Sequence, residues 1–211
     1  VPLYIVFGDD ARKDNVEATP EDIYEYVSKN GSLTKTSAVS VGEYEEYFKS
    51  FTEGGNTVIH FSISSGFSST GNNARIAAEE FENVYIVDTK NLSTGSGHMV
   101  LKAVELVEAG ASAEEIVKVC ENLADKIDAS FVICNLDYLR MGGRCSTVAA
   151  IGANILKLKP CIEVVDGKMI VGKKHRGTFA ACLKEYVKDR LDGKLNETES
   201  DRIFVTHTKC D

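Results

Sequence analysis

Six hydroxyl side chains lie close together in one short stretch of the sequence, Ser62-Ile63-Ser64-Ser65-Gly66-Phe67-Ser68-Ser69-Thr70-Gly71. The apolar run 57–61 before it predicts a buried strand, and residues 72–81 after it predict a helix. The first amides of a helix have no partner inside the helix and carry partial positive charge, and small residues let an anion approach them. This turn is therefore predicted to hold one anionic head group, a phosphate or a carboxylate.

Two other interpretations of the turn stay open. Ser68 to Thr70 can act simply as helix caps, because serine and threonine are preferred there, although one hydroxyl would suffice for that. Alternatively, Ser68 can be the nucleophile of an acyl hydrolase. The G-x-S-x-G spacing of the nucleophile elbow is missed by one residue, however, and no histidine can be assigned to Ser68 as its base.

Composition restricts the classes of function. The chain has 211 residues, enough for one large domain or two small ones with a sizeable core. Its net charge of −8 argues against binding along a nucleic-acid backbone. No apolar run is long enough for stable membrane insertion, and no signal-peptide pattern is present. The six cysteines have no C-x-x-C or zinc-finger spacing. They indicate free thiols in a reducing cytoplasm, and no metal site or cofactor is expected.

Strands and helices are expected to alternate through the first 134 residues. The expected strands are 3–7, 57–63, 84–87 and 131–134, with 8–18 a turn or a strand pair and 31–39 a loop. The expected helices are 19–29, 40–51, 72–81, one that follows the polar loop 88–97, and 113–127. This alternation predicts βαβ units and a parallel sheet. Gly95-Ser96-Gly97 lacks the third glycine of a dinucleotide fingerprint, so no nucleotide cofactor is predicted.

The alternation of strands and helices ends near residue 145. We place the boundary between two lobes there, 1–145 and 146–211. The predicted helix 148–156 is rich in small residues, which permit close packing or leave room for something bulky and apolar. Asp166-Gly167 between apolar runs predicts a tight hairpin over 161–171. The basic run 173–176 is interpreted as a solvated strand end, with an anion or partner contact as the alternative. A helix over 178–192 and a strand over 202–206 complete the pattern.

Five motifs in this order resemble the signature stretches of the DegV family over nearly the whole chain. They are Lys35-Thr36-Ser37, Ile63-Ser64-Ser65-Gly66-Phe67-Ser68-Ser69-Thr70, Ile86-Val87-Asp88-Thr89-Lys90, Leu139-Arg140-Met141-Gly142-Gly143-Arg144-Cys145-Ser146, and Leu158-Lys159-Pro160 followed by the Asp-Gly hairpin and Lys174-His175-Arg176. Any one motif is weak evidence for the family, whereas five motifs in the expected order are specific to it. The resemblance implies two α/β lobes, one with a parallel sheet and one with a β-hairpin, and a ligand between them.

The resemblance also implies a function. DegV-like proteins are similar to carriers that hold a long-chain fatty acid and present it to a separate fatty-acid kinase in bacteria, without being enzymes themselves. By the resemblance, Thr36 and Ser68 hold the carboxylate. Ser69 stands where the family usually has a glycine and adds a hydroxyl. Arg144, after paired glycines, is expected near the mouth of the site and the kinase surface. Apolar helices with small residues are expected to line a tunnel for the acyl chain.

The sequence therefore leaves three functions open: a fatty-acid carrier, a hydrolase that uses Ser68, and a non-catalytic regulatory partner. The resemblance also leads us to expect family segments outside this sequence. They are an opening strand with an Asp-Ser pair before Val1, and a closing segment after Asp211 with a histidine that supports the carboxylate. His207 does not lie in that motif and is not given its role.

Overall fold

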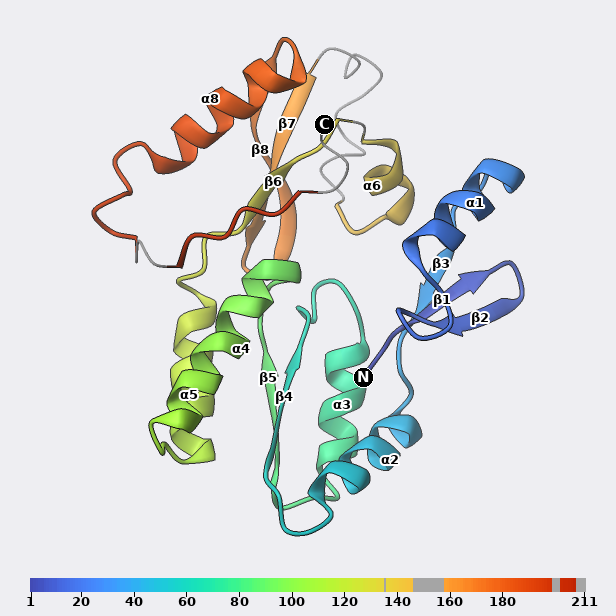
Figure 1. Ribbon diagram of the computed structural model, residues 1–211, viewed down its shortest axis with the longest axis vertical. Coiled ribbons are helices and arrows are strands. Elements are labelled where there is room, and N and C mark those ends of the chain that lie inside the picture. Colours follow the sequence, from blue (N-terminus) through green and yellow to red (C-terminus); the bar gives the residue numbers. More distant parts are fainter. Residues whose placement is uncertain (135, 146–157, 199–201, 208–211) are drawn as a thin grey trace.

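The computed structural model describes residues 1–134, 136–145, 158–198 and 202–207. Within these ranges the chain is a mixed α/β protein with two lobes, as the motifs implied (Figure 1). The lower lobe in that view contains a parallel pair of strands with helices on both faces. The upper lobe contains an antiparallel sheet and one long helix. A small third sheet lies beside them.

The strands of the described residues form three sheets. The bounds are β1 Tyr4–Phe7, β2 Asp10–Lys13, β3 Lys35–Ser37, β4 Val58–Ser62, β5 Val84–Asp88, β6 Ser130–Val132, β7 Leu158–Val165 and β8 Lys168–Arg176. β1 pairs antiparallel with β2 and β3, and β7 pairs antiparallel with β6 and β8. β4 and β5 run parallel and form a β-α-β unit with the helix between them, which confirms the expected unit.

Most of the helices begin within two residues of their predicted starts. Their bounds are α1 Pro20–Asn30, α2 Val41–Thr52, α3 Thr70–Ala78, α4 Ser93–Glu108, α5 Ala113–Ala124, α6 Asp137–Gly142 and α8 Phe179–Leu191. Thr19, Ser40 and Ser112 each close a capping box with the acidic residue three positions later. Such boxes satisfy two amides that would otherwise have no partner, which fixes the first turn.

Two apolar cores hold the helices on the parallel pair. On one face, Tyr44 and Phe48 of α2 pack with Ala74 and Ala77 of α3. On the other face, α4 and α5 bury a cluster around Val87 of β5. Figure 1 shows this layering, with α2 and α3 to one side of β4 and β5 and α4 and α5 to the other. A strand pair covered on both faces is apolar along its length, which is why 57–61 and 84–87 read as buried runs.

A third core lies under the sheet β6-β7-β8, which we call the hairpin sheet. Its buried members include Leu136, Cys145 and Ile162, and Phe67 of the serine-rich turn 62–71 packs against them. The hairpin turn is Asp166-Gly167, with φ of 48° and 72°. Positive φ at both central residues is the signature of the type I′ turn, which confirms the predicted hairpin.

Three expectations about local structure were wrong. Lys35–Ser37 is a strand, because it pairs with the second edge of β1. α4 begins at Ser93, so Gly95-Ser96-Gly97 is helical. Residues 202–207 form no strand, and they contact α4 through side chains instead, with Phe204 stacked on His98 and Arg202 paired with Glu105. The basic run is the end of strand β8, as its preferred interpretation expected.

The structure bears on some of the other expectations and leaves the rest as predictions. Residues 8–18 contain strand β2, which pairs antiparallel with β1, so the predicted strand pair is confirmed. The cysteines are free thiols, Cys134 exposed and the others buried at 120, 145, 161 and 182; Cys210 is not described. The predicted helix 148–156 also falls outside the described residues. In the described ranges no helix is long and apolar enough to cross a membrane. The lobe boundary near residue 145 stays a prediction, and β6 pairs with β7 across it.

Candidate ligand-binding site

The serine-rich turn, residues 62–71, leaves the carboxyl end of β4 and starts α3. Ligands of open α/β sheets bind at this edge. Three of its six hydroxyl residues, Ser62, Ser64 and Thr70, are buried, and the first two serve the fold. Ser62 is buried under Gly71, where an added Cβ would lie 2.6 Å from the Ser62 Oγ. Ser64 donates its hydroxyl hydrogen to the carbonyl oxygen of Gly167 at 2.6 Å. Thr70 is the first residue of α3.

Ser68 and Thr70 form a hydroxyl pair at the start of α3. Their Oγ and Oγ1 atoms lie 2.7 Å apart, and the Ser68 Oγ also accepts from the Thr70 N–H at 3.2 Å. Two hydroxyls in one mutual bond use one hydrogen, so the second hydrogen is available to an acceptor. The cap interpretation is therefore correct in part, since Ser68 binds a helical amide. Ser69 makes no side-chain cap bond and is exposed.

Thr36 lies in β3, exposed, with its backbone opposite Ile5 of β1. The segment after β3 is fastened to α3, because the Asn73 side-chain amide donates to the Val39 carbonyl oxygen at 2.7 Å. This bond joins the segment carrying Thr36 to the helix that follows Ser68. In the part of the chain that the structure describes, no hydrogen bond joins the side chains of Thr36 and Ser68 directly.

Arg144 is exposed and follows α6 and its left-handed cap, Gly143 with φ of 70°. Its guanidinium donates to the carbonyl oxygen of Gly142 at 2.7 Å. This local bond holds the side chain beside the helix end. No described contact brings Arg144 to Ser68 or Thr36.

The loop after β5 lies beside the serine-rich turn and was not singled out as part of the site. The Asp88 carboxylate accepts from the Ser65 N–H at 3.2 Å and from the Lys90 N–H at 2.8 Å. The hydroxyl hydrogen of Thr89 goes to the carbonyl oxygen of Ser62 at 2.8 Å. Asp88 and Thr89 are members of one quoted motif, Ile86 to Lys90. Their contacts indicate that this motif shapes the serine-rich turn.

The described residues offer little for catalysis at this turn. No hydrogen bond links Ser68 to a histidine or a carboxylate among them, whereas an activated serine requires such a base. No group of three or more histidine, cysteine or acidic side chains in the described ranges could hold a metal ion.

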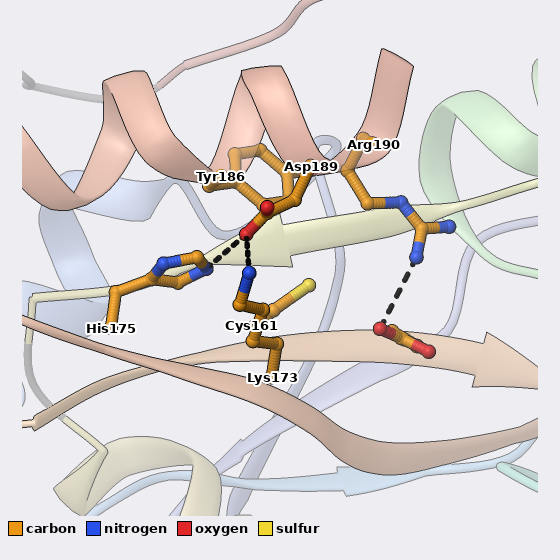
Figure 2. A pocket seen from close by; sticks show the side chains of 7 residues that line it. Cys161, Lys173, His175, Tyr186, Asp189 and Arg190 are labelled. Carbon is orange, nitrogen blue, oxygen red and sulfur yellow. Dashed lines mark ion pairs between the residues drawn. The ribbon is translucent and has the colours of Figure 1, made fainter. Parts of the chain in front are cut away.

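A separate polar pocket of about 170 Å³ lies between α8 and the hairpin sheet (Figure 2). Lys173 pairs with Asp189 at 2.6 Å, and this contact lowers the pKa of the Asp189 carboxyl. Arg190 pairs with Glu163 at 3.2 Å. Burial raises the pKa of the Cys161 thiol to about 12, so it stays protonated. Within each of the two ion pairs, Lys173–Asp189 and Arg190–Glu163, the opposite charges compensate each other.

The basic run 173–176 contributes to this pocket, although its preferred interpretation was a solvated strand end. Lys174 and Arg176 are exposed, as that interpretation expected. His175 is buried, with its Nε2 atom 3.9 Å from the Asp189 Oδ2. A bulge between Pro160 and Ile162 shifts the register of β7 against β8 opposite this run. Such an irregularity changes the face to which side chains point, which sequence periodicity does not reveal.

Comparison with known proteins identifies the family. The family model described as "Uncharacterised protein, DegV family" matches residues 1–211. A fatty acid-binding protein of Thermotoga maritima is 35% identical over 214 residues, covering 98% of this chain and 73% of that protein. The stearic acid-binding protein of Eubacterium ventriosum superposes with a TM-score of 0.82 at 31% identity, covering 95% of this chain and 71% of the other.

A second similar structure shows fatty-acid binding by a DegV family protein from Thermus thermophilus. Its TM-score is 0.79 at 31% identity, covering 89% of this chain and 68% of that one. The chain therefore belongs to the DegV family, as the five motifs indicated.

Proposed function

We propose that this protein binds one long-chain fatty acid between its lobes, 1–145 and 146–211. Thr36 and Ser68 hold the carboxylate, Ser69 lies beside it, and an apolar tunnel takes the acyl chain. The Ser68–Thr70 hydroxyl pair at the start of α3 carries the proposal, because it leaves one hydroxyl hydrogen for an anion. Relatives named as fatty-acid-binding proteins support the choice of a fatty acid over a phosphate.

The energetics fit a carrier. Each buried methylene of an acyl chain contributes about 0.8 kcal/mol, so the tail supplies most of the affinity. The head group then mainly fixes orientation. Neutral hydroxyls hold a carboxylate without a cation that would reduce its nucleophilicity. The acid thus stays reactive toward a phosphoryl donor.

We further propose that the protein acts in the cytoplasm and presents its ligand to a fatty-acid kinase, and that it is not itself an enzyme. Arg144 supports this proposal, since it is exposed at the end of α6 and offers a planar guanidinium. Guanidinium groups suit the recognition of phosphate or carboxylate on a partner.

Replacement of both head-group residues tests the proposal. The Thr36→Ala/Ser68→Ala variant is expected to retain a fatty acid roughly tenfold less well, because two hydrogen-bond donors to a carboxylate are lost. It is expected to stay folded, since Thr36 is exposed and Ser68 is only half-buried. Native mass spectrometry of the purified protein before and after denaturation measures the bound acid and its identity.

A Ser37→Ala/Ser65→Ala variant is the matched control. Both replaced residues are exposed hydroxyls in the same two segments, and neither is assigned to the head group. Equal retention in the two double variants contradicts the assignment of Thr36 and Ser68. Turnover of an acyl ester by the pure protein would favour the hydrolase instead. A protein without bound lipid that retains a protein partner would favour a regulatory role.

A further inference from the structure

The tip of the β7–β8 hairpin, Asp166-Gly167, touches the serine-rich turn of the other lobe. In Figure 1 the lower end of this hairpin lies just above the upper ends of β4 and β5. The contact is a buried hydrogen bond of 2.6 Å from the Ser64 Oγ to the Gly167 carbonyl oxygen, across 103 positions of sequence. Ser64 is 1% exposed. Water therefore has little access to this bond.

Two glycines make this close approach possible. A Cβ added to Gly66 would lie 2.4 Å from the Gly167 carbonyl oxygen, and a Cβ added to Gly167 would lie 2.5 Å from the Ser64 Oγ. Both distances are shorter than any contact that a real Cβ makes. Gly167 also has φ of 72°, which favours glycine. The two backbones are therefore fitted to each other at this point.

Ser64 also determines the path of the turn toward Ser68. Its carbonyl oxygen accepts from the Phe67 N–H at 2.9 Å and from the Ser68 N–H at 3.3 Å. Its Oγ accepts from the Gly66 N–H at 3.1 Å. One residue thus binds the hairpin tip through its hydroxyl and the amide of Ser68 through its carbonyl.

A second contact links the turn to the upper lobe independently. Phe67 is partly buried against the core of the hairpin sheet, with Leu136, Ile162 and Met169. The residue immediately before Ser68 is therefore packed in the other lobe. The backbone of Ser68 lies between an anchor at Ser64 and an anchor at Phe67.

We infer that Ser64 is a positioning residue, and that its contact with Gly167 holds the Ser68 hydroxyl where the carboxylate binds. This inference rests on the proposed function for the role of Ser68. It implies that the head-group site keeps its shape only while the hairpin tip is docked. Displacement of the hairpin sheet by a partner then weakens the hold on the carboxylate without any change in Thr36 or Ser68.

Hydrogen exchange and ligand release test this inference. In Ser64→Ala the amides of residues 67 and 68 are expected to exchange about tenfold faster in the ligand-free protein, because the buried Gly167 carbonyl loses its donor and no longer holds the turn. Stearic acid, used as the probe, is expected to leave about tenfold faster as well. A purely structural role for Ser64 would lower the denaturation midpoint without this local change in exchange.

A pair of glycine variants controls for backbone strain. Gly167 and Gly193 have nearly the same φ, 72° and 71°, but a Cβ on Gly193 would meet nothing within 4 Å. Gly167→Ala is expected to accelerate amide exchange at residues 67 and 68 and the release of stearic acid, whereas Gly193→Ala leaves both unchanged. Equal behaviour of the two variants overturns the inference.

The outcomes separate this inference from the proposed function. Normal exchange and normal release in Ser64→Ala and Gly167→Ala overturn the positioning role, even where Thr36→Ala/Ser68→Ala loses the acid. Faster exchange and release in these variants supports it. If the double variant nevertheless retains the acid, then only the assignment of the head group to Thr36 and Ser68 fails.

Discussion

Replacing Phe48 by alanine is expected to lower the free energy of unfolding by about 3–5 kcal/mol. Phe48 is 1% exposed in the core between α2, α3 and β4. Its ring stacks on Tyr44 at 5.4 Å and meets Phe81 edge-on at 6.1 Å. Truncation removes these contacts and leaves a cavity that the surrounding rings fill only in part. Urea denaturation at pH 7 measures the loss.

Phe51→Ala is the matched control for this prediction. Phe51 is the same residue type in the same helix, three positions later, and it is 57% exposed. Its truncation is expected to change stability by no more than about 0.5 kcal/mol, as is usual on surfaces. Similar losses in the two variants would mean that α2 does not bury Phe48 against α3. That result would also undermine the placement of Ser68 and Thr70 at the start of α3.

Local signals in the sequence predicted the parts of the fold that local chemistry determines. The helices 19–29, 40–51 and 113–127 were predicted, and each begins with a hydroxyl residue and an acid three positions later, a pair that satisfies the same amides in any context. Asp166-Gly167 was recognised because few turns accept positive φ at two successive residues.

Elements that depend on distant partners were not predicted. Lys35–Ser37 carries no apolar pattern and becomes a strand only because an edge of β1 is free to pair with it. Residues 202–206 have the composition of a strand but contact α4 with their side chains instead. β propensity describes how a side chain fits a half-buried sheet surface, so it does not determine structure without a partner.

In the candidate site, too, local features were predictable from the sequence, whereas features that depend on distant contacts were not. The density of hydroxyls located the serine-rich turn, but the sequence did not distinguish which hydroxyls serve the fold. Ser64 looks like Ser68 in the sequence, whereas in the structure its hydroxyl is committed to Gly167. Thr36 and Arg144 were selected through the family resemblance, because nothing in their immediate neighbours marks them.

Acid is expected to destabilise the protein through His60, with about 2 kcal/mol lost between pH 7 and pH 5. Burial of the His60 ring lowers its pKa from 6.5 to about 4. The ring lies between Tyr44 and Phe48, at centroid distances of 5.2 Å and 5.8 Å. The Tyr44 hydroxyl, whose pKa burial raises to about 12, lies 3.3 Å from the His60 Nε2 and can donate to the neutral ring.

The sign follows from which state binds the proton. Between pH 6.5 and about 4 the unfolded chain protonates His60 and the folded protein does not, so falling pH favours unfolding. The stabilisation by the neutral ring is complete above pH 6.5 and is lost as the pH approaches 4. Free energies of unfolding from urea titrations at pH 7, 6 and 5 measure the slope.

The variant His60→Gln isolates this contribution, because glutamine cannot take up a proton in this range. It is expected to be less stable than the parent at pH 7, since the aromatic contacts with Tyr44 and Phe48 are lost. Its stability should change far less than that of the parent between pH 7 and pH 5. His98→Gln is the control and should keep most of the parent slope, because His98 stacks on the exposed Phe204 in a less buried place. An unchanged slope in His60→Gln would mean that another group drives acid destabilisation.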